Sequence, residues 1–170
     1  MYFPKPLYSD TLFHMTYTAT IEIPKNSDRR IHRTIKDDEE GKYKKGEFYD
    51  FGLISEKITA NNGLMPLAYG FIEGTVGSDG EDDEVDVMVF SSNDYKTADS
   101  LQVTPFAMMV REDGDYKLLA HDSTMEINSW DDVPAEMQQT LLAFNGFHKK
   151  IVEIKGKEDT IAYLESVKTN

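Results

Sequence analysis

The densest group of side chains able to do chemistry is the acidic run between positions 79 and 86. Six of these eight positions are carboxylates: Asp79, Glu81, Asp82, Asp83, Glu84 and Asp86. Carboxylate oxygens are the ligands that hard divalent cations such as Mg²⁺ select in proteins. A plain acidic loop on the surface is the alternative interpretation. The run continues into an apolar segment, and this is the feature that favours a metal site.

Asp86 lies inside that apolar segment, between Val85 and Val87. Successive side chains of a strand point to opposite faces, so Asp86 shares a face with Met88 if the valines share the other. A carboxylate that points from a strand into a barrel is costly unless a metal or another cation neutralises it. Asp83 precedes Asp86 by three positions at the junction of loop and strand. We therefore expect the two acids to converge on shared metal ions.

Most of the first two-thirds of the chain is strand-like. Short apolar or alternating runs cover residues 17–23, 48–54, 69–76, 85–90, 102–110 and 116–121. Turn-forming sequences rich in Asn, Asp, Ser and Gly separate them. Many short strands between turns favour a closed or nearly closed barrel over a sheet of βαβ units.

The last third has helical spacing. Pro134 suits the first turn of a helix, and Asp131 and Asp132 precede it as possible caps. Four residues then share one predicted face: Met137, Leu141, Phe144 and His148. A second short helix is predicted from Ile161, Leu164 and Val167 and begins near Glu158.

Length and composition narrow the function classes. The 170 residues fit a single domain, 1–170. The absence of cysteine excludes disulfides, zinc-thiolate sites and thiol nucleophiles. With 31 acidic and 18 basic residues, the net charge of −13 argues against nucleic acid as a partner. We see neither a signal peptide in residues 1–20 nor an apolar run long enough for a membrane span, and we expect a cytoplasmic protein.

The acidic run resembles the signature of the soluble family I inorganic pyrophosphatases. That signature reads Asp, small, Asp, Pro or Glu, apolar, Asp, apolar, and its second and third acids match Asp83 and Asp86. The first acid is either Glu81 or, with two extra residues after Gly80, Asp79. The alignment does not choose between them.

Four further segments extend the resemblance along the chain in the family's order. Residues 20–24 resemble the early strand whose Glu, here Glu22, lies in the active site. Residues 66–72 resemble the strand whose Tyr, here Tyr69, binds phosphate. Residues 115–120 are similar to the Asp-x-Lys strand, and residues 144–149 resemble the C-terminal helix that carries a Tyr-Lys pair.

The resemblance implies hydrolysis of inorganic pyrophosphate to two phosphates by metal-activated water, without a covalent intermediate. The implied metal ligands are Asp79, Glu81, Asp83, Asp86, Asp115 and Glu112. The implied catalytic residues are Asp83, which would orient or deprotonate the water, Glu22 and Tyr69. The implied substrate-binding residues are Arg30, Lys57, Lys117, His148 and Lys149. Two or more Mg²⁺ ions are implied as cofactors, with Mn²⁺ as a substitute, and the chain is expected to form a homo-oligomer.

We therefore predict a mainly β fold: an OB-like five-stranded closed β-barrel with additional strands and two C-terminal helices packed on it. Five positions depart from the family pattern. Arg30 stands where the family has a Lys, and Lys57 stands where it has an Arg. His32 takes the place of a Glu, and His148 takes the place of a Tyr. Arg111 takes the place of a metal-binding Asp. Glu112 or Asp113 could serve in place of that Asp. Exchanges between Lys and Arg keep the charge but change the hydrogen-bonding geometry. Two alternatives follow: a hydrolase of another phosphoanhydride on the same fold, and a catalytically impaired binding domain.

Overall fold

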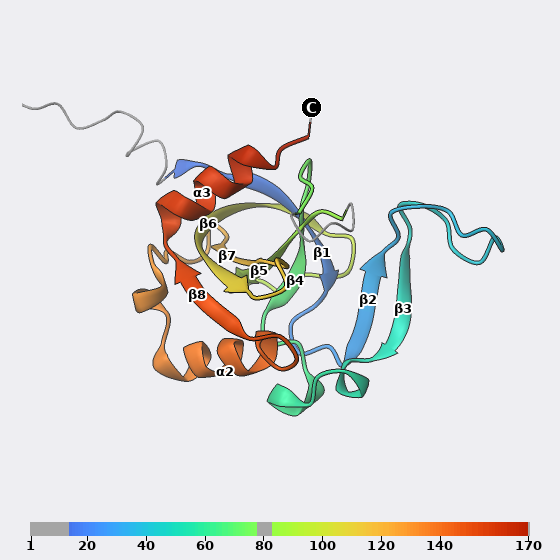
Figure 1. The fold of residues 1–170 in the computed structure, drawn as a ribbon, viewed down its shortest axis with the longest axis horizontal. Coiled ribbons are helices and arrows are strands. Elements are labelled where there is room, and N and C mark those ends of the chain that lie inside the picture. The colour runs from blue at the N-terminus through green and yellow to red at the C-terminus, as the bar shows by residue number, and fades with distance from the viewer. Residues whose placement is uncertain (1–13, 78–82, 170) are drawn as a thin grey trace, which may run out of the picture.

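The computed structural model describes residues 14–77 and 83–169 and is built around a ring of five strands (Figure 1). In order around the ring these are β1 (Tyr17–Ile23), β4 (Ala68–Ile72), β5 (Val85–Phe90), β7 (Lys117–His121) and β6 (Ser100–Arg111). The pairing of β6 with β1, from Tyr17 opposite Val103 to Thr20 opposite Ser100, closes the ring. β5 and β7 run parallel and the other neighbours antiparallel. The predicted OB-like five-stranded barrel is confirmed.

Three further strands lie outside the ring. β8 (Ile151–Lys155) pairs with the second half of β6. β2 (Arg29–Arg33) and β3 (Phe48–Leu53) form a separate hairpin beside the barrel (Figure 1). The sequence predicted β3 but neither β2 nor β8, because β2 is almost wholly basic and no residue of either strand is fully buried. Strands predicted at 17–23 and 85–90 have the expected bounds, whereas the one predicted at 69–76 ends at Ile72.

Two helices follow, α2 (Ala135–Asn145) and α3 (Lys157–Ser166). Pro134 is the residue before the first turn of α2, and no side chain caps that turn. The predicted caps are wrong, since Asp132 instead accepts a hydrogen bond from the Asn128 backbone at 3.0 Å. The helix stops before Gly146, so His148 does not share its face. Within the described residues no helix is both long and apolar enough to cross a bilayer.

The buried apolar residues form two clusters separated by the wall of the barrel. One contains residues from all five ring strands and lies inside the ring, where Ile161 and Leu164 of α3 close it. The other packs the outer surface of the strands against Leu141 and Phe144 of α2. Because the valines of β5 belong to the inner cluster, the alternating Asp86 faces outward. The expectation that this carboxylate points into the barrel is wrong.

Candidate functional site

Lys117, the first residue of β7, contacts three other predicted site residues on the outer face of the barrel. The parallel register places it opposite Asp86 of β5. Its Nζ atom lies 2.5 Å from Asp86 Oδ2 and 3.2 Å from Asp115 Oδ2, and it donates a hydrogen bond of 3.0 Å to the Tyr69 hydroxyl. Only 7% of Lys117 is exposed. The cation that the outward-facing Asp86 requires is therefore this lysine.

The surrounding groups determine the protonation states of Lys117 and Tyr69. Burial alone would lower the pKa of Lys117, but Asp86, Tyr69 and Asp115 outweigh it and hold the pKa well above its usual value. Burial, followed by the charge of Asp86, raises the pKa of Tyr69 well above its usual value, against the opposing effect of Lys117. At neutral pH Lys117 is therefore a cation and Tyr69 a neutral phenol.

Two acids beside Lys117 and Tyr69, namely Asp83 and Asp115, have raised pKa values. Partial burial, with the neighbouring Glu84 and Asp86, raises the pKa of Asp83 to about 7. Burial also raises the pKa of Asp115, which Lys117 lowers and Asp86 raises, and the net shift is upward. Burial is the largest cause in both cases, and the charges of neighbouring carboxylates add to it. We call Asp83, Asp86 and Asp115 the acid edge.

The described residues of the acid edge do not by themselves form a metal centre. Across residues 14–77 and 83–169, no three side chains of the types that bind metals are arranged to hold an ion. Asp79 and Glu81, the two candidates for the first acid of the signature, lie outside the described residues. Glu112 does not join the acid edge, because its carboxylate accepts a hydrogen bond of 3.1 Å from the backbone of Lys150. The chemistry of the acid edge still suits a hard cation, because its side chains offer carboxylate oxygens as ligands.

Glu22 approaches the site through an irregularity in β1. The register between β1 and β4 shifts between Ile21 and Ile23, so Glu22 is the extra residue of a bulge, a device that redirects side chains. It is 5% exposed and accepts a hydrogen bond of 2.7 Å from the backbone of Arg33. Its carboxylate also lies 3.5 Å from the ring of His32. The charge of Glu22 contributes to the raised pKa values of Tyr69 and Asp83, which places it in the same site.

Arg33 connects the β2–β3 hairpin to acids next to the acid edge. It was not among the predicted site residues. Its guanidinium contacts the carboxylate of Glu84, lies 3.2 Å from that of Glu73, and sits 3.9 Å over the ring of Phe71. A basic segment in a chain with an acidic run was the only signal available in the sequence. The contact holds the hairpin against the barrel beside the site.

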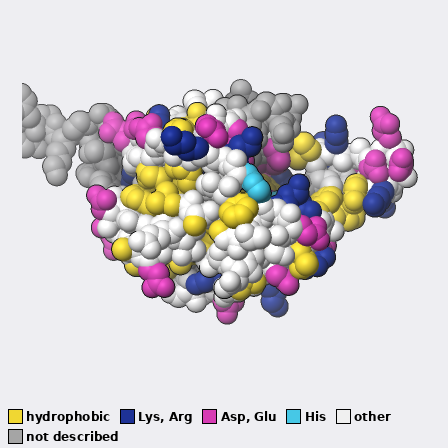
Figure 2. All heavy atoms as spheres, turned by 60° about the horizontal axis from the view of Figure 1, so that its bottom comes forward, with side chains coloured by type: hydrophobic (Ala, Val, Ile, Leu, Met, Phe, Trp, Pro, Cys, Tyr) yellow, Lys and Arg dark blue, Asp and Glu magenta, His cyan; other side chains and the backbone are white. Residues whose placement is uncertain are grey.

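A cavity of about 150 Å³ opens next to Lys117 and Tyr69, between the hairpin and the segment after α2. Its polar and charged lining consists of Arg30, His32, Lys57, Tyr69, Arg111, Lys117, Asn145 and His148. Its apolar lining consists of Ile23, Ile54, Ile58, Met65, Phe144 and Phe147. None of these described lining residues is acidic. Figure 2 shows Lys and Arg side chains gathered beside a histidine near the middle of this side of the molecule.

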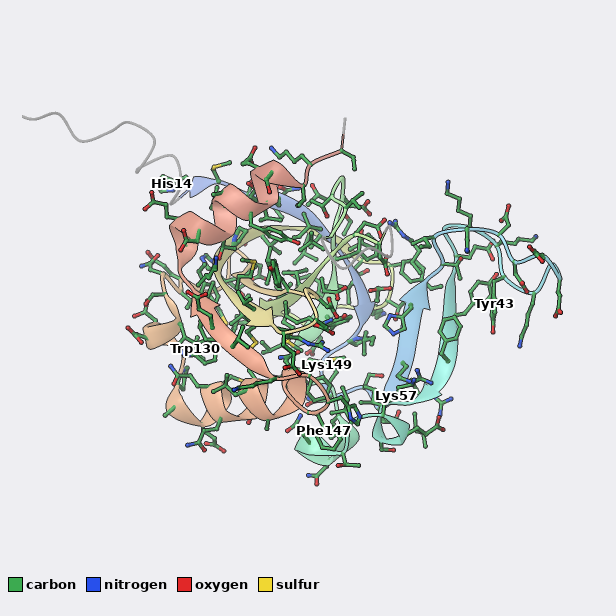
Figure 3. All side chains as sticks on the ribbon, viewed as in Figure 1. His14, Tyr43, Lys57, Trp130, Phe147 and Lys149 are labelled. Carbon is green, nitrogen blue, oxygen red and sulfur yellow. The ribbon has the colours of Figure 1, made fainter. Side chains whose placement is uncertain are left out.

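Four of the five predicted substrate-binding residues line this cavity: Arg30, Lys57, Lys117 and His148. Lys57 follows the short 3-10 turn Ile54–Glu56, and its carbonyl oxygen accepts a hydrogen bond from the ring of His148. Arg30 donates a hydrogen bond of 2.5 Å to the Phe51 carbonyl. Lys149 is exposed and does not line the cavity. Lys57 and Phe147, both labelled in Figure 3, line the cavity from different segments of the chain.

Arg111 ends β6 and is the remaining cation of the cavity. Its two terminal nitrogens lie 3.3 Å from Asp115 and 3.2 Å from Asp113. The position of Arg111 where the family pattern has a metal-binding Asp was noted from the sequence. Its place in the wall of the cavity came only from the tertiary structure.

A model of the inorganic pyrophosphatase family matches residues 19–169. The chain belongs to this family. The match covers all of the ring except the first two residues of β1, and it includes the hairpin and both helices. It makes the chain a family I pyrophosphatase, whose reaction is the hydrolysis of pyrophosphate.

Solved inorganic pyrophosphatases share the fold of this family member. The enzyme from Ehrlichia chaffeensis matches with a TM-score of 0.72 and 22% identity over 89% of this chain and 92% of that one. The enzyme from Thermus thermophilus gives 0.69 and 16% identity over 89% and 88%. The enzyme from Neisseria gonorrhoeae gives 0.68 and 19% identity over 88% and 87%. A comparison with curated protein sequences gives no match.

Proposed function

We propose that this pyrophosphatase works at the junction of the acid edge and the cavity, with at least two Mg²⁺ ions held by carboxylates. The observation that carries this proposal is the position of Lys117. It contacts Asp86 and Asp115 of the acid edge and also lines the cavity. One buried residue thus connects oxygen ligands suited to a metal with cations suited to phosphate.

The proposed ligands are Asp83, Asp86 and Asp115, with either Asp79 or Glu81 as a further acid. Mn²⁺ is the expected substitute, because it also prefers oxygen ligands. Bound divalent ions supply two things here: a lower pKa of water and neutralisation of phosphoryl charge. Glu112, engaged with Lys150, is the least supported of the predicted ligands.

The protein's own groups would handle the proton and the leaving phosphate. Asp83, with a pKa of about 7, is suited to accept the proton of the attacking water near neutral pH. Lys117 supplies a fixed positive charge for the phosphoryl oxygens. Tyr69 accepts the hydrogen bond of Lys117 and keeps its own hydroxyl proton to donate to phosphate. Water attacks directly, and no residue forms a covalent bond with phosphorus.

We further propose that residues 1–170 form one domain acting in the cytoplasm as a homo-oligomer. The single ring of strands and the family match from residue 19 to 169 support the single domain. The resemblance described above supports the compartment and the oligomer. The net charge of −13 favours a small metal-bound substrate over nucleic acid.

The test is phosphate release from pyrophosphate with Mg²⁺, with Mn²⁺, and after chelation with EDTA. We expect turnover with either ion and none with EDTA. Asp86→Asn should lose turnover, and an activity equal to that of the wild type would rule out the acid edge as the metal site. Release from tripolyphosphate or ATP but not from pyrophosphate would support the alternative phosphoanhydride substrate. No release from any of them would support a binding domain.

A further inference from the structure

Among the described residues, the carboxylates that pair with the cations of the cavity all lie outside its lining. Lys117 and Arg111 share Asp115, and each has one further carboxylate, Asp86 and Asp113 respectively. None of these acids lines the cavity. The nearest carboxylate that Arg30 reaches among the described residues is Glu56, at 4.0 Å. The described lining of the cavity therefore carries cations, and the acids that pair with them lie outside the lining. This arrangement occurs in a protein whose net charge is −13.

Two hydrogen-bond donors in the cavity wall are unsatisfied. The Nε atoms of Arg30 and Arg111 are buried and have no hydrogen-bond partner among the described residues. A buried donor without a partner costs about 1–3 kcal/mol, and native structures contain few of them. Both belong to residues that line the same cavity. A small shift of either guanidinium would expose its Nε to a ligand that brings several acceptor oxygens into the cavity.

The size of the cavity favours a compact ligand. Its volume of about 150 Å³ is close to that of an engineered cavity of about 150 Å³ that binds benzene. A pyrophosphate ion fits such a space, whereas a nucleotide would have to leave its base outside. Charge, free donors and size all indicate a small polyanion with oxygen acceptors.

Arg111 is the cation best fixed for this task. Asp113 and Asp115 hold its two terminal nitrogens, and only 15% of its side chain is exposed. A guanidinium held in one plane recognises phosphate oxygens with defined geometry, which an ammonium group does not. The register shift between Val110 and Arg111 in the pairing with β8 gives the backbone its local position.

We propose that the cavity binds pyrophosphate through the protein's own cations, with Arg111 as a substrate-binding residue, so that binding of the anion requires no metal ion. The proposal rests on the proposed function for the identity of the anion. Asp113 is then a positioning residue, which acts by fixing the guanidinium. Metal ions at the acid edge remain necessary for hydrolysis but not for occupancy of the cavity.

Calorimetric titration of the EDTA-treated, desalted protein with sodium pyrophosphate tests the proposal directly. We expect saturable binding by the wild type and an affinity at least about 10-fold lower in Arg111→Gln, which removes one fixed charge and its hydrogen bonds. Arg111→Lys keeps the charge and should fall between the two. Asp113→Asn should weaken binding less than Arg111→Gln, because Asp115 still holds the guanidinium. ATP should bind more weakly than pyrophosphate.

The matched control is Arg29→Gln. Arg29 belongs to the same hairpin as Arg30, pairs with Asp50 at 2.8 Å, and does not line the cavity. Its loss changes the net charge equally, so binding should stay within about twofold of the wild type. An equal loss of pyrophosphate affinity in Arg29→Gln would show that only the net charge of the protein matters, and it would overturn the role of Arg111.

The proposal and the proposed function fail in different ways. Wild-type protein that hydrolyses pyrophosphate with Mg²⁺ but binds none without metal would overturn this proposal and leave the function standing. Metal-free binding without hydrolysis would overturn the function and leave this site standing. Stronger binding of ATP than of pyrophosphate would overturn the size argument. If Arg111→Gln does not fold, as judged by circular dichroism, the comparison of Arg111→Lys with Arg29→Gln decides.

Discussion

The acid edge and the cavity are both built from charged side chains, but they differ in how these charges are satisfied. At the acid edge, Lys117 is almost fully enclosed and its contacts go to Asp86, Asp115 and Tyr69. In the cavity wall, Arg30 and Arg111 each have a buried nitrogen with no partner in the part of the chain that the structure describes. In the first region the protein's own groups satisfy the buried cation, whereas in the second region each guanidinium keeps one hydrogen-bond donor for which the described residues supply no acceptor.

The departures from the family pattern follow the same division. All five line the cavity: Arg30, His32, Lys57, Arg111 and His148. The matching residues Glu22, Asp83, Asp86 and Asp115 lie outside its lining, and Tyr69 and Lys117 form the boundary. Divergence in this chain is thus concentrated on the walls that would touch phosphate, while the carboxylates suited to metal keep the expected types.

The sharpest separation of the two regions comes from Asp83→Asn. It removes the proposed general base and should lower the turnover number for pyrophosphate by about 10²–10⁴-fold. Pyrophosphate binding to the metal-free protein should persist, because Asp83 does not line the cavity. Steady-state kinetics and calorimetry measure the two effects. Asp94→Asn, in an exposed loop, is the control, and full turnover in Asp83→Asn would refute the assignment.

Lysines in the two regions should differ in their effect on stability. Lys117→Met leaves Asp86 and Asp115 facing each other without their cation, and breaking a buried pair in this way costs about 3–5 kcal/mol. Lys57→Met removes an exposed cation and should change the free energy of unfolding by less than about 0.5 kcal/mol. Urea denaturation of the metal-free proteins measures both. Equal losses in the two variants would contradict the distinction between a lysine buried among carboxylates and an exposed one.

Addition of Mg²⁺ should stabilise the acid edge and not the cavity. At about 100 times the dissociation constant, a ligand that binds only the folded state adds about 2.7 kcal/mol. We expect the thermal midpoint of the wild type and of Lys57→Met to rise alike with Mg²⁺, and that of Asp86→Asn to stay nearly constant. A wild-type rise in Asp86→Asn would place the metal elsewhere.

Asp122, just after the far end of β7 from Lys117, shows what a purely structural acid should do. Burial raises its pKa, but hydrogen bonds from Ser91, Thr124 and Tyr95 outweigh this and leave the pKa below its usual value. Such a group adds stability above its unfolded pKa and loses it as pH falls through the folded pKa. Asp122→Asn should therefore cost about 1–2 kcal/mol at pH 7, with a smaller difference from wild type near pH 3.

Turnover by Asp122→Asn should remain close to that of the wild type, because the substitution lies far from the acid edge along the strand. Urea denaturation at both pH values and a phosphate-release assay measure these effects. A constant difference in stability between pH 7 and pH 3 would contradict the lowered pKa.

Much of the barrel was predictable from local pattern. The alternation in residues 17–23 and 85–90 gave the correct bounds of β1 and β5, because each strand buries one face inside the ring. β2 escaped prediction, since its basic residues gain burial only by contact with acids elsewhere, as Arg33 does with Glu84. The helix predicted through His148 ends at Asn145, and from Ile151 the chain instead pairs with β6 as β8.

The sequence by itself determined the family and the kinds of groups in the site, because short motifs such as the acid run and Asp115-Tyr116-Lys117 carry them within a few residues. Only the tertiary structure decided which charges meet. Asp86 and Lys117, 31 positions apart, are paired by the parallel register of β5 and β7. Arg30, Lys57 and Arg111 surround one cavity because a hairpin, a short turn and a ring strand pack together there. Register and packing depend on contacts between distant segments, and no local pattern encodes them.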